Sequence, residues 1–316
     1  MSQWRDNIRR VEPYVPGEQP KEKNVIKLNT NENPYGPSPR VQMVKENMDD
    51  LRLYPDPTAG ALVDALAEYH GVNPDQVFVG VGSDDVLSMA FLTFFNAKKP
   101  IRFPDITYSF YDVWAELYRI PYEQPALDEN FKIRREDYYG ENGGVVFPNP
   151  NAPTGIAEDL EFVEDIISHN PDVVVIVDEA YVDFGGTSAL SLIDKYENLL
   201  VVRTFSKSRS MAGLRIGYAI GQPELIRALN DVKYSFNSYT MNRPSLLLGV
   251  ESIRDEAYFR ETVAGIIRTR EQFGEEMKKL GFTFPESKAN FIFATHKTAK
   301  AKDIFEAAKK KGIYVR

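Results

Sequence analysis

Short apolar runs alternate with amphipathic stretches along most of this chain. Such runs are typical of strands that are buried on both faces of a parallel sheet. Before the first run, Thr58–His70 places Leu62, Ala65, Leu66 and Tyr69 on one face of a predicted helix. Strands are predicted at residues 77–79, 101–103, 145–147, 173–177, 199–202 and 218–220, and further helices at 86–95 and 159–167. This alternation predicts a largely parallel sheet that is covered on both faces.

The pattern changes near both ends of the chain. Residues 11–17 contain prolines at positions that exclude a regular helix, and residues 29–39 are rich in Asn, Pro and Gly, as in an ordered loop. After Asn242-Arg243-Pro244 a long charged helix is predicted at about 258–280, followed by a helix at 302–311. We therefore expect an N-terminal arm (1–33), a large domain (34–243) and a smaller α+β domain (244–316). The smaller domain is expected to be incomplete, because Arg316 falls within a predicted strand.

Composition and charge narrow the class of protein. The chain has 316 residues, 43% of them hydrophobic, which is enough for about two domains. A net charge of −8 and a pI near 5.2 argue against nucleic acid or an anionic membrane as a partner. No cysteine is present, so we expect no disulfide framework and no thiolate metal site, in keeping with a cytoplasmic location. Residues 1–10 are charged and lack the apolar core of a signal peptide, and no apolar run approaches the ~20 residues of a membrane span.

Two motifs stand where predicted strands end. Asp178-Glu179-Ala180-Tyr181 follows the run at 173–177, and Thr204-Phe205-Ser206-Lys207 follows the run at 199–202. Open α/β sheets bind their ligands at the carboxyl ends of strands. A lysine in such a cleft can form a Schiff base with an aldehyde cofactor, and a buried aspartate beside it can keep a pyridinium nitrogen charged. The pair therefore points to pyridoxal phosphate before any other cofactor.

Each of these residues also has an ordinary structural interpretation. Lys207 could be a solvated loop lysine. Asp178 could be a metal ligand of the Walker-B type, although the chain has no Gly-x-x-x-x-Gly-Lys-Ser/Thr motif to accompany it. We expect no metal site.

Two further segments have the chemistry of a phosphate site. Gly82-Ser83-Asp84-Asp85 lies between a predicted strand and a buried helix, where free N–H groups and the helix dipole favour an anion; we expect Ser83 or Asp84 to cap that helix. Arg215 lies between glycines and apolar residues, and its guanidinium suits a phosphate. The stretch from Gly80 is not a dinucleotide-binding fingerprint, because Asp85 stands where the third glycine belongs.

Two loop segments are less specific. Asn149–Gly155 follows a predicted strand and has the composition of a plain turn. Tyr108 would by default be a core or surface aromatic residue, but it could also stack on a planar cofactor ring.

In their order along the chain, these segments resemble the fold-type I pyridoxal-phosphate aminotransferases, and among them the histidinol-phosphate aminotransferase family. The Asp-Glu-Ala-Tyr, Ser-Lys and Gly-Leu-Arg motifs carry the resemblance to the superfamily. The Asn-Glu-Asn-Pro-Tyr-Gly motif and the final Val-Arg favour the narrower family. The matching segments are residues 28–37, 54–57, 82–85, 107–109, 149–155, 178–181, 204–207 and 213–217. The resemblance implies a three-layer α/β sandwich with a mostly parallel sheet, plus a smaller α+β domain.

The resemblance also implies a role for individual residues. Lys207 would be the Schiff-base lysine and the general acid and base. Asp178 would pair with the pyridine nitrogen, Tyr181 would donate a hydrogen bond to the ring hydroxyl oxygen, and Tyr108 would stack on the ring. The cofactor phosphate would be held by Ser83, Asp84, Ser206 and Arg215.

Three more residues gain a role in this way. Tyr54 would reach the phosphate of the cofactor in the other subunit, which implies a homodimer. The expectation of a dimer also rests on Tyr54 and the N-terminal arm having no evident use within one subunit. Tyr14 and Arg316 would line the substrate pocket and meet a phosphate or carboxylate of the substrate.

The chain departs from the family pattern at two places. The family has Asn-Pro-Asn-Asn-Pro-Thr-Gly, and its second paired asparagine touches the ring hydroxyl; here that position is Ala152. The contact is therefore absent or comes from Asn151. The family also continues beyond the position of Arg316 with another strand and a second substrate-binding arginine.

The activity that the resemblance implies is transfer of the amino group of L-histidinol phosphate to 2-oxoglutarate, giving imidazole-acetol phosphate and glutamate in histidine biosynthesis. An aromatic amino-acid aminotransferase and a threonine-phosphate decarboxylase have overlapping motifs and remain alternatives. From other classes, a regulatory binding module without turnover and a nicotinamide oxidoreductase also remain, the latter disfavoured by the missing glycine.

Overall fold

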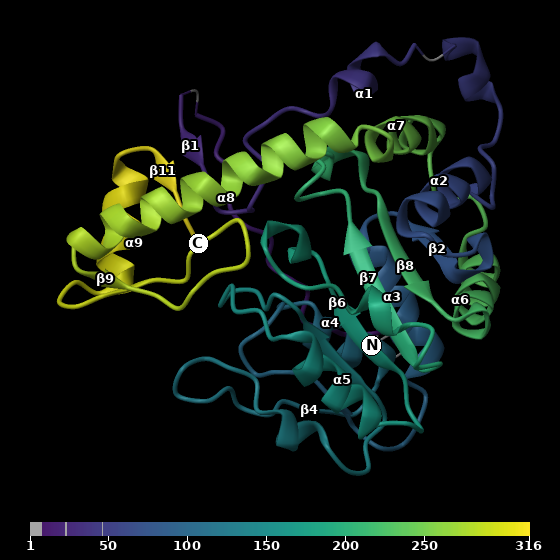
Figure 1. Ribbon diagram of the computed structural model, residues 1–316, viewed down its shortest axis with the longest axis horizontal. Coiled ribbons are helices and arrows are strands. Elements are labelled where there is room, and N and C mark those ends of the chain that lie inside the picture. The colour runs from purple at the N-terminus through teal and green to yellow at the C-terminus, as the bar shows by residue number, and fades with distance from the viewer. Residues whose placement is uncertain (1–7, 23, 46) are drawn as a thin grey trace, which may run out of the picture.

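A seven-stranded sheet forms the centre of the computed structural model, which describes residues 8–22, 24–45 and 47–316 (Figure 1). Its strands, in spatial order, are β2 (Val77–Gly80), β8 (Gly217–Gly221), β7 (Leu199–Thr204), β6 (Val175–Asp178), β5 (Val145–Pro148), β3 (Ile101–Arg102) and β4 (Tyr122–Glu123). From β7 through β4 each pairing is parallel. β8 runs antiparallel to both of its neighbours, β2 and β7. The strands predicted from the apolar runs are all present.

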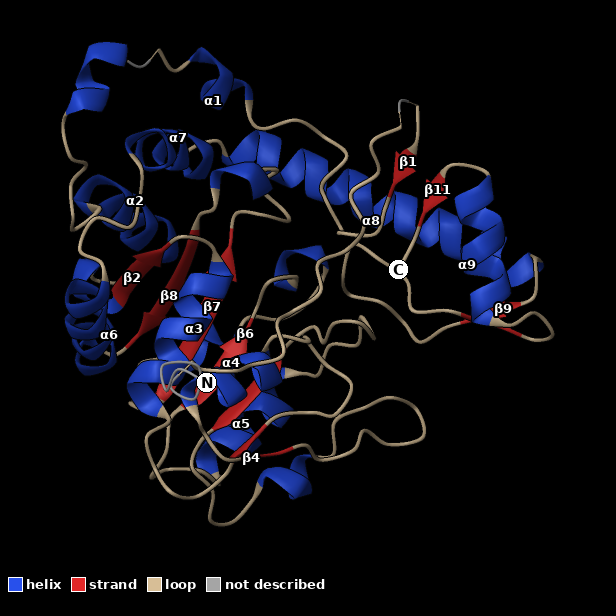
Figure 2. Cartoon of the chain, turned by 180° about the vertical axis from the view of Figure 1, so that it is seen from behind, coloured by secondary structure: helices blue, strands red, loops and turns tan. Residues whose placement is uncertain are grey.

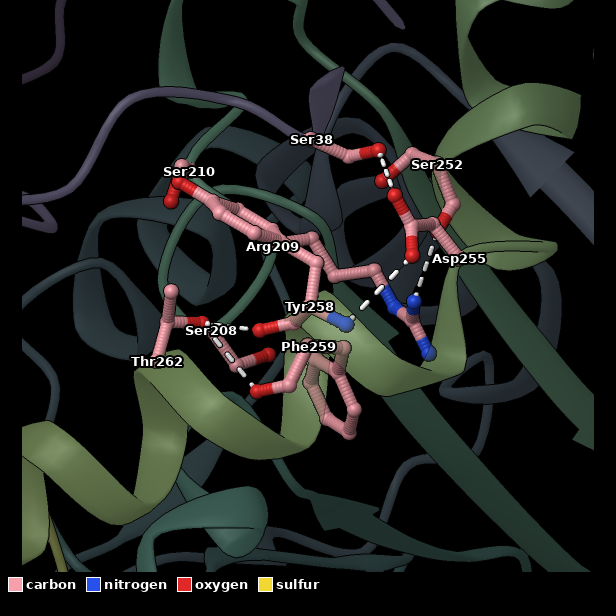
Figure 3. Close-up of a pocket in the computed structure, with 9 residues that line it drawn as sticks. All are labelled: Ser38, Ser208, Arg209, Ser210, Ser252, Asp255, Tyr258, Phe259 and Thr262. Carbon is pink, nitrogen blue, oxygen red and sulfur yellow. Dashed lines mark hydrogen bonds between the residues drawn. The ribbon is translucent and has the colours of Figure 1, made fainter. Parts of the chain in front are cut away.

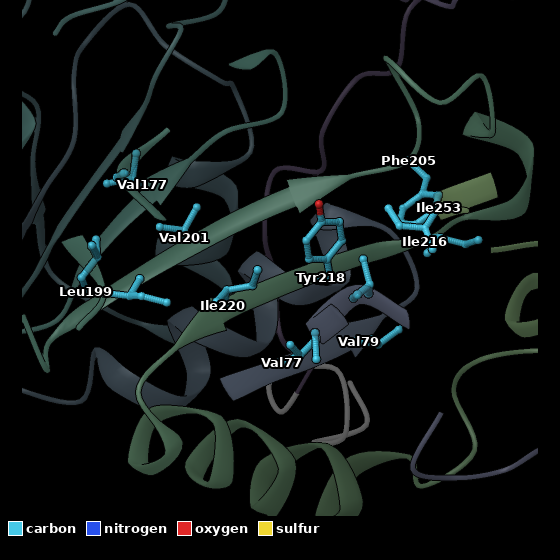
Figure 4. Packing of buried hydrophobic residues seen from close by; sticks show 14 of the residues in the cluster. Val77, Val79, Val177, Leu199, Val201, Phe205, Ile216, Tyr218, Ile220 and Ile253 are labelled. Atoms are coloured by element: carbon cyan, nitrogen blue, oxygen red, sulfur yellow. The ribbon is translucent and has the colours of Figure 1, made fainter. Parts of the chain in front are cut away.

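Side chains of the central strands alternate between two cores, because successive residues of a strand face opposite sides of the sheet. Val175, Val177, Leu199 and Val201 lie in one core, together with Tyr218 and Ile220 (Figure 4). Ile176, Leu200, Val202 and Ala219 lie in the other. Continuous apolar runs in sequence thus reflect burial on both faces.

Helices cover both faces and give the predicted three-layer arrangement (Figure 2). The first face carries α2 (Gly60–His70), α5 (Leu160–Ser168) and α7 (Arg243–Ile253); the second carries α3 (Ser83–Phe94), α4 (Tyr111–Tyr118) and α6 (Pro223–Phe236). Among the helices that the structure describes, none is both long enough and apolar enough to cross a bilayer.

Helix boundaries follow from local capping. The predicted helix at 58–70 begins two residues later, at Gly60, because Asp56 accepts hydrogen bonds from the N–H groups of Thr58 and Gly60. Asp159 caps α5 by accepting from the N–H of Phe162. Short 3-10 helices lie at Met48–Arg52, Pro74–Gln76, Arg135–Tyr138, Val182–Phe184, Ala189–Leu192 and Ala212–Leu214.

The C-terminal part of the chain is arranged around the long helix α8 (Glu256–Lys279), which runs along one side of the molecule in Figure 1. β9 (Phe282–Thr283) pairs antiparallel with β10 (Thr295–His296), and α9 (Ala301–Lys310) leads to β11 (Ile313–Tyr314). β11 pairs in parallel with β1 (Ile26–Lys27) of the N-terminal arm. A short helix, α1 (Pro39–Met43), follows the arm.

The division of the chain at residue 243/244 stays a prediction. It falls between the first two residues of α7, whose Leu246, Val250 and Ile253 pack in the first core over the sheet. The final predicted strand is shorter than expected, since β11 ends at Tyr314. Residues 1–7, which hold most of the segment that lacks the pattern of a signal peptide, lie outside the described residues.

Gly217 provides a test of the packing between β8 and the start of α3. A Cβ atom at Gly217 would come within 2.2 Å of the carbonyl carbon of Gly82 and 2.3 Å of the nitrogen of Ser83. Because these are backbone atoms, we expect Gly217→Ala to lower the free energy of unfolding by about 1–3 kcal/mol, measured by urea denaturation. Gly213→Ala is the matched control, since a Cβ at Gly213 meets no atom within 4 Å. Equal stability of the two variants would contradict the packing described here.

Candidate active site

Asp178 ends β6 and is 4% exposed. One of its carboxylate oxygens accepts a hydrogen bond from the hydroxyl of Tyr111 at 2.9 Å, and the other accepts from the N–H of Ala180 at 3.1 Å. Burial raises the pKa of Asp178 to about 6, partly offset by these two hydrogen bonds and by the positive charge of Lys207. Asp178 is thus a buried carboxylate whose charge the two hydrogen bonds only partly stabilise.

Lys207 lies in the loop after β7, the strand next to β6, so its side chain starts at the same edge of the sheet. Its Nζ donates to the carbonyl oxygen of Thr30 at 3.0 Å and lies 5.5 Å from the ring centroid of Tyr181. The amide of Asn33 donates to the carbonyl oxygens of Lys207 (2.9 Å) and Ser208 (3.2 Å). The N-terminal arm therefore holds both the backbone and the amine of this lysine.

A partly buried ion network lies next to the lysine loop. The hydroxyl of Ser208 donates to Asp183 at 2.5 Å, and Arg203 forms ion pairs with Asp183 and Glu179, each at 3.2 Å. Burial raises the pKa of Glu179, which the pairing with Arg203 opposes. The network ties the loop to the segment that follows Asp178.

Arg209 fastens the other side of the loop to the junction of α7 and α8 (Figure 3). Its guanidinium donates to the carbonyl oxygen of Ser252 at 2.8 Å and lies 4.0 Å from the ring centroid of Phe259. Ser38 donates to Asp255, the N-cap of α8, in the same small pocket. These contacts hold the loop against the start of α8.

Tyr181 packs against a small apolar cluster that includes Phe184 and Phe291. The ring of Phe291 meets it edge-on, with the centroids 5.0 Å apart. The side-chain amide of Asn31 donates to the Tyr181 hydroxyl oxygen at 3.1 Å. Tyr181 and Lys207 thus lie together, as the sequence predicts.

Arg215, Asp84 and Ser206 converge from three segments. A guanidinium nitrogen of Arg215 donates to Asp84 at 2.9 Å, and another lies 3.5 Å from the hydroxyl of Ser206. Tyr108 donates its hydroxyl to the other carboxylate oxygen of Asp84 at 2.7 Å. The predicted phosphate-binding side chains are thus brought together, with Ser83 in the first turn of α3 beside them.

The prediction that Ser83 or Asp84 caps α3 is wrong. The N-cap is Gly82, with a φ of +86°, so the first turn receives no hydrogen bond from a capping side chain. A Cβ atom on Gly82 would lie 2.4 Å from a guanidinium nitrogen of Arg215. The absence of that side chain leaves room for the arginine at the helix N-terminus, where the dipole favours an anion.

A row of aromatic side chains connects Tyr108 with Tyr14, which contacts Arg316. Phe110 lies 5.6 Å from Tyr108 between centroids, and Tyr14 stacks on Phe110 at 4.0 Å. The hydroxyl of Tyr14 accepts a hydrogen bond from Arg316 at 3.4 Å. Tyr14 and Arg316, both predicted to bind substrate, therefore lie together near Tyr108. Burial raises the pKa of Tyr108 above its ordinary value, so its hydroxyl stays protonated.

The side chain of Asn151 is hydrogen-bonded to a neighbouring loop. Its amide donates to the carbonyl oxygen of Ile106 at 3.0 Å, and its oxygen accepts from the hydroxyl of Thr107 at 2.9 Å. Ala152 packs on the apolar cluster around Tyr181. The cofactor-binding role of Asn151 stays a prediction, and in this structure its side chain orders the loop that carries Tyr108.

Tyr54 is 81% exposed and stacks on Tyr239, with the centroids 4.7 Å apart. It has no contact here with the residues described above. The expectation that the N-terminal arm has no use within one subunit is wrong, because Tyr14, Thr30, Asn31 and Asn33 all contact residues at or near the site.

Sequence reasoning missed three residues of the site. Tyr111 is the first residue of α4 and lies three positions after Tyr108, which was the available signal for it. Asn31 and Asn33 lie in the Asn-Glu-Asn-Pro motif, but nothing in their spacing identifies partners more than 100 residues away. Within residues 8–22, 24–45 and 47–316, no group of three acidic or histidine side chains is placed to hold a metal ion.

Comparison with known proteins identifies a family model and relatives that match this chain. A family model described as "Aminotransferase class I and II" matches residues 23–316. Histidinol-phosphate aminotransferase of Clostridium botulinum (strain Kyoto / Type A2) is 53% identical over 319 aligned positions, which cover 100% of this chain and 90% of that protein. The enzyme of the same name from Lactococcus lactis subsp. cremoris (strain SK11) is 51% identical over 315 positions, covering 99% and 88%.

Solved structures show the same architecture. The crystal structure of histidinol-phosphate aminotransferase from Sinorhizobium meliloti, in complex with pyridoxal-5'-phosphate, superposes with a TM-score of 0.84 at 25% sequence identity. The match covers 92% of this chain and 82% of that one.

The raised pKa of Asp178 predicts how stability depends on pH in the protein freed of any cofactor. The folded state binds the proton of the Asp178 carboxyl more tightly than the unfolded chain does. The free energy of unfolding therefore falls as the pH rises from about 4 to about 6. Asp178→Asn should therefore increase the free energy of unfolding at pH 8 by up to ~3 kcal/mol, and so raise the melting temperature. This gain in stability should fade near pH 4. The measurement is calorimetry at both pH values.

Asp172→Asn is the control for this experiment. Asp172 is exposed and lies shortly before β6, at the other end of the strand from Asp178. The same change of charge there should leave the difference between pH 8 and pH 4 unaltered. A loss of stability in Asp178→Asn at pH 8 would contradict the cost assigned to the buried carboxylate.

Proposed function

Because the chain belongs to the class I and II aminotransferase family, we propose that it transfers the amino group of L-histidinol phosphate to 2-oxoglutarate. The products are imidazole-acetol phosphate and glutamate, and the pathway is histidine biosynthesis. The observation that carries the proposal is the pair formed by a buried Asp178 and Lys207 at the ends of adjacent strands. Relatives with 51–53% identity over nearly the whole chain support the choice of substrate.

The cofactor is pyridoxal 5'-phosphate, and the residues present fit it. The buried carboxylate of Asp178, whose pKa is raised to about 6, would gain an opposite charge from a cationic ring nitrogen. The cluster of Arg215, Ser206 and the uncapped N-terminus of α3 offers several hydrogen-bond donors to a phosphate. Tyr108, held by Asp84, would lie against the ring, and Tyr181 would face the ring hydroxyl oxygen. When bound, the cofactor supplies an electron sink for negative charge at the substrate α-carbon.

The side chains of this protein supply the proton transfers and the fixed charges. Lys207 takes the proton from the α-carbon of the amino donor, and the contacts from Thr30 and Asn33 keep its amine and backbone in place for that step. Asp178 keeps the ring nitrogen protonated. The hydrogen bonds from Tyr111 and Ala180 orient the carboxylate toward that role.

Tyr14 and Arg316 form the proposed substrate-binding end of the site. Their mutual hydrogen bond and the stacking of Tyr14 on Phe110 place a cation and an aromatic ring beside Tyr108. A guanidinium suits both the phosphate ester of histidinol phosphate and the distal carboxylate of glutamate. The two substrates of the exchange can therefore use the same cation.

We further propose a homodimer that works in the cytoplasm. Exposed apolar side chains gather near Tyr54, which itself stacks on Tyr239, and such surface is typical of an interface between subunits. They include Leu51 and Leu53, the neighbours of Tyr54 in the sequence. Tyr54 contacts none of the site residues of its own chain, and we propose that it serves the site of the second subunit. The absence of cysteine accords with a reducing compartment.

The proposal is tested by comparing amino donors. We expect the purified enzyme to convert histidinol phosphate with a kcat/KM well above that for phenylalanine, because the side chain of phenylalanine has no distal anion to pair with Arg316. Lys207→Ala should abolish both reactions while the protein still folds and binds the cofactor weakly. Exposed Lys195→Ala is the matched control and should keep full activity. A preference for phenylalanine would favour an aromatic aminotransferase, and release of CO2 from threonine phosphate would favour the decarboxylase.

Shared sites predict complementation between two impaired subunits. A hybrid of one Tyr54→Phe chain and one Lys207→Ala chain should contain one intact site and reach about half of the wild-type activity per dimer, because each intact site needs Tyr54 from one chain and Lys207 from the other. Loss of one hydrogen bond to the phosphate should weaken binding of the cofactor by about tenfold. Activity is therefore measured at a limiting concentration of cofactor, where weaker binding lowers the activity.

The control carries both substitutions on the same chain, paired with a wild-type chain. In that hybrid neither site has both residues, so its activity should stay well below that of the first hybrid. Equal activity of the two hybrids would show that Tyr54 does not act across the interface.

A further inference from the structure

The loop Thr30–Asn33 of the N-terminal arm contacts both side chains that would act on the cofactor. Thr30 accepts a hydrogen bond from the amine of Lys207 at 3.0 Å, and Asn33 donates to the backbone of the same lysine at 2.9 Å. Between them, Asn31 donates its side-chain amide to the hydroxyl oxygen of Tyr181 at 3.1 Å. The functions proposed above use Lys207 and Tyr181 but leave this amide unexplained.

We propose that Asn31 is a positioning residue that directs the hydroxyl proton of Tyr181 toward the cofactor. A phenol oxygen that accepts a hydrogen bond still has its own proton to donate, and the accepted bond makes that O–H a stronger donor. The inference rests on the proposed function, because it needs an acceptor in the position of the ring hydroxyl oxygen.

Packing fixes the ring of Tyr181 but leaves its hydroxyl proton to be directed by a polar neighbour. The ring lies in the apolar cluster with Phe184, Ala289 and Phe291, and Ala152 adds a methyl group to the same cluster. The side-chain amide of Asn151, the residue before Ala152, is hydrogen-bonded to Ile106 and Thr107. Asn31 is therefore the amide placed to act on this hydroxyl.

Asn31 is itself held firmly. Its φ of +54° lies in the left-handed region, which asparagine tolerates better than most residues. Its carbonyl oxygen accepts a hydrogen bond from the amide of Asn290 at 3.0 Å. The preceding residue, Thr30, accepts from Lys27 at 2.7 Å as well as from Lys207. A donor on such a backbone has a defined direction.

Asn31→Gly removes the amide and keeps a residue that adopts positive φ without strain. The readout is the pH titration of the visible absorbance of the enzyme loaded with pyridoxal phosphate. Donation by Tyr181 stabilises negative charge on the ring oxygen, so a weaker donor makes the chromophore hold its proton more tightly. We expect the titration midpoint to rise by about half to one pH unit, which corresponds to one hydrogen bond, and the dissociation constant of the cofactor to rise several-fold.

The double variant with Tyr181→Phe separates positioning from a general structural effect. Once the hydroxyl is gone, Asn31→Gly should cause no additional shift of the midpoint. Asn31→Asp is the second variant, because aspartate also tolerates positive φ. Its carboxylate would accept a hydrogen bond from the Tyr181 hydroxyl, whereas the amide of Asn31 donates one to it. Its midpoint should rise further than that of Asn31→Gly.

Asn24→Gly is the matched control. Asn24 is an exposed asparagine of the same arm with a φ of +65°, so the same substitution is made on a similar backbone away from the site. Its midpoint should equal that of the wild type. An unchanged midpoint in Asn31→Gly, or an equal shift with and without the Tyr181 hydroxyl, would overturn the inference while leaving the proposed function intact. If the unmodified protein formed no visible chromophore with the cofactor, both would fall.

Discussion

The site depends on a carboxylate placed where the protein alone cannot fully stabilise its charge. Asp178 ends a strand whose other residues are completely buried, and two hydrogen bonds leave its pKa near 6. A buried charge without an opposite partner is costly, and proteins keep such costs where function needs them. In this fold the cost prepares a place for a positively charged ring nitrogen. The sheet around it, buried on both faces, supplies the stability that offsets it.

The lysine loop shows how much structure is needed to hold one amine. Ser208 donates to Asp183 in a partly buried ion network, and Arg209 contacts both Ser252 and Phe259. From the opposite direction, the N-terminal arm reaches the backbone and the amine of Lys207. A loop with contacts on every side loses little further entropy when a ligand arrives, and this is how a site becomes preorganised.

The sheet and the family could be predicted from sequence because their signals are local. Apolar runs such as 173–177 mark strands buried on both faces, and motifs that follow them place chemistry at strand ends. The family prediction is confirmed by the comparison with class I and II aminotransferases. The N-cap at Gly82 was mispredicted because its reason is not local: Arg215, far along the chain, needs the space. The same limit hid the contact of Asn31 with Tyr181, since two residues 150 positions apart meet only through the fold.

The pairing of β1 with β11 joins two segments that lie far apart in the sequence. Ile26 lies opposite Ile313, and the N–H of Leu28 donates to the carbonyl oxygen of Tyr314 at 2.8 Å. During synthesis the sheet and the lysine loop leave the ribosome well before residue 314 does. The arm that carries Thr30, Asn31 and Asn33 gains its strand partner only after that residue emerges, although it was made first. The site is therefore completed only after residue 314 has emerged, and a shorter chain would hold a folded sheet with a lysine that its arm does not yet restrain.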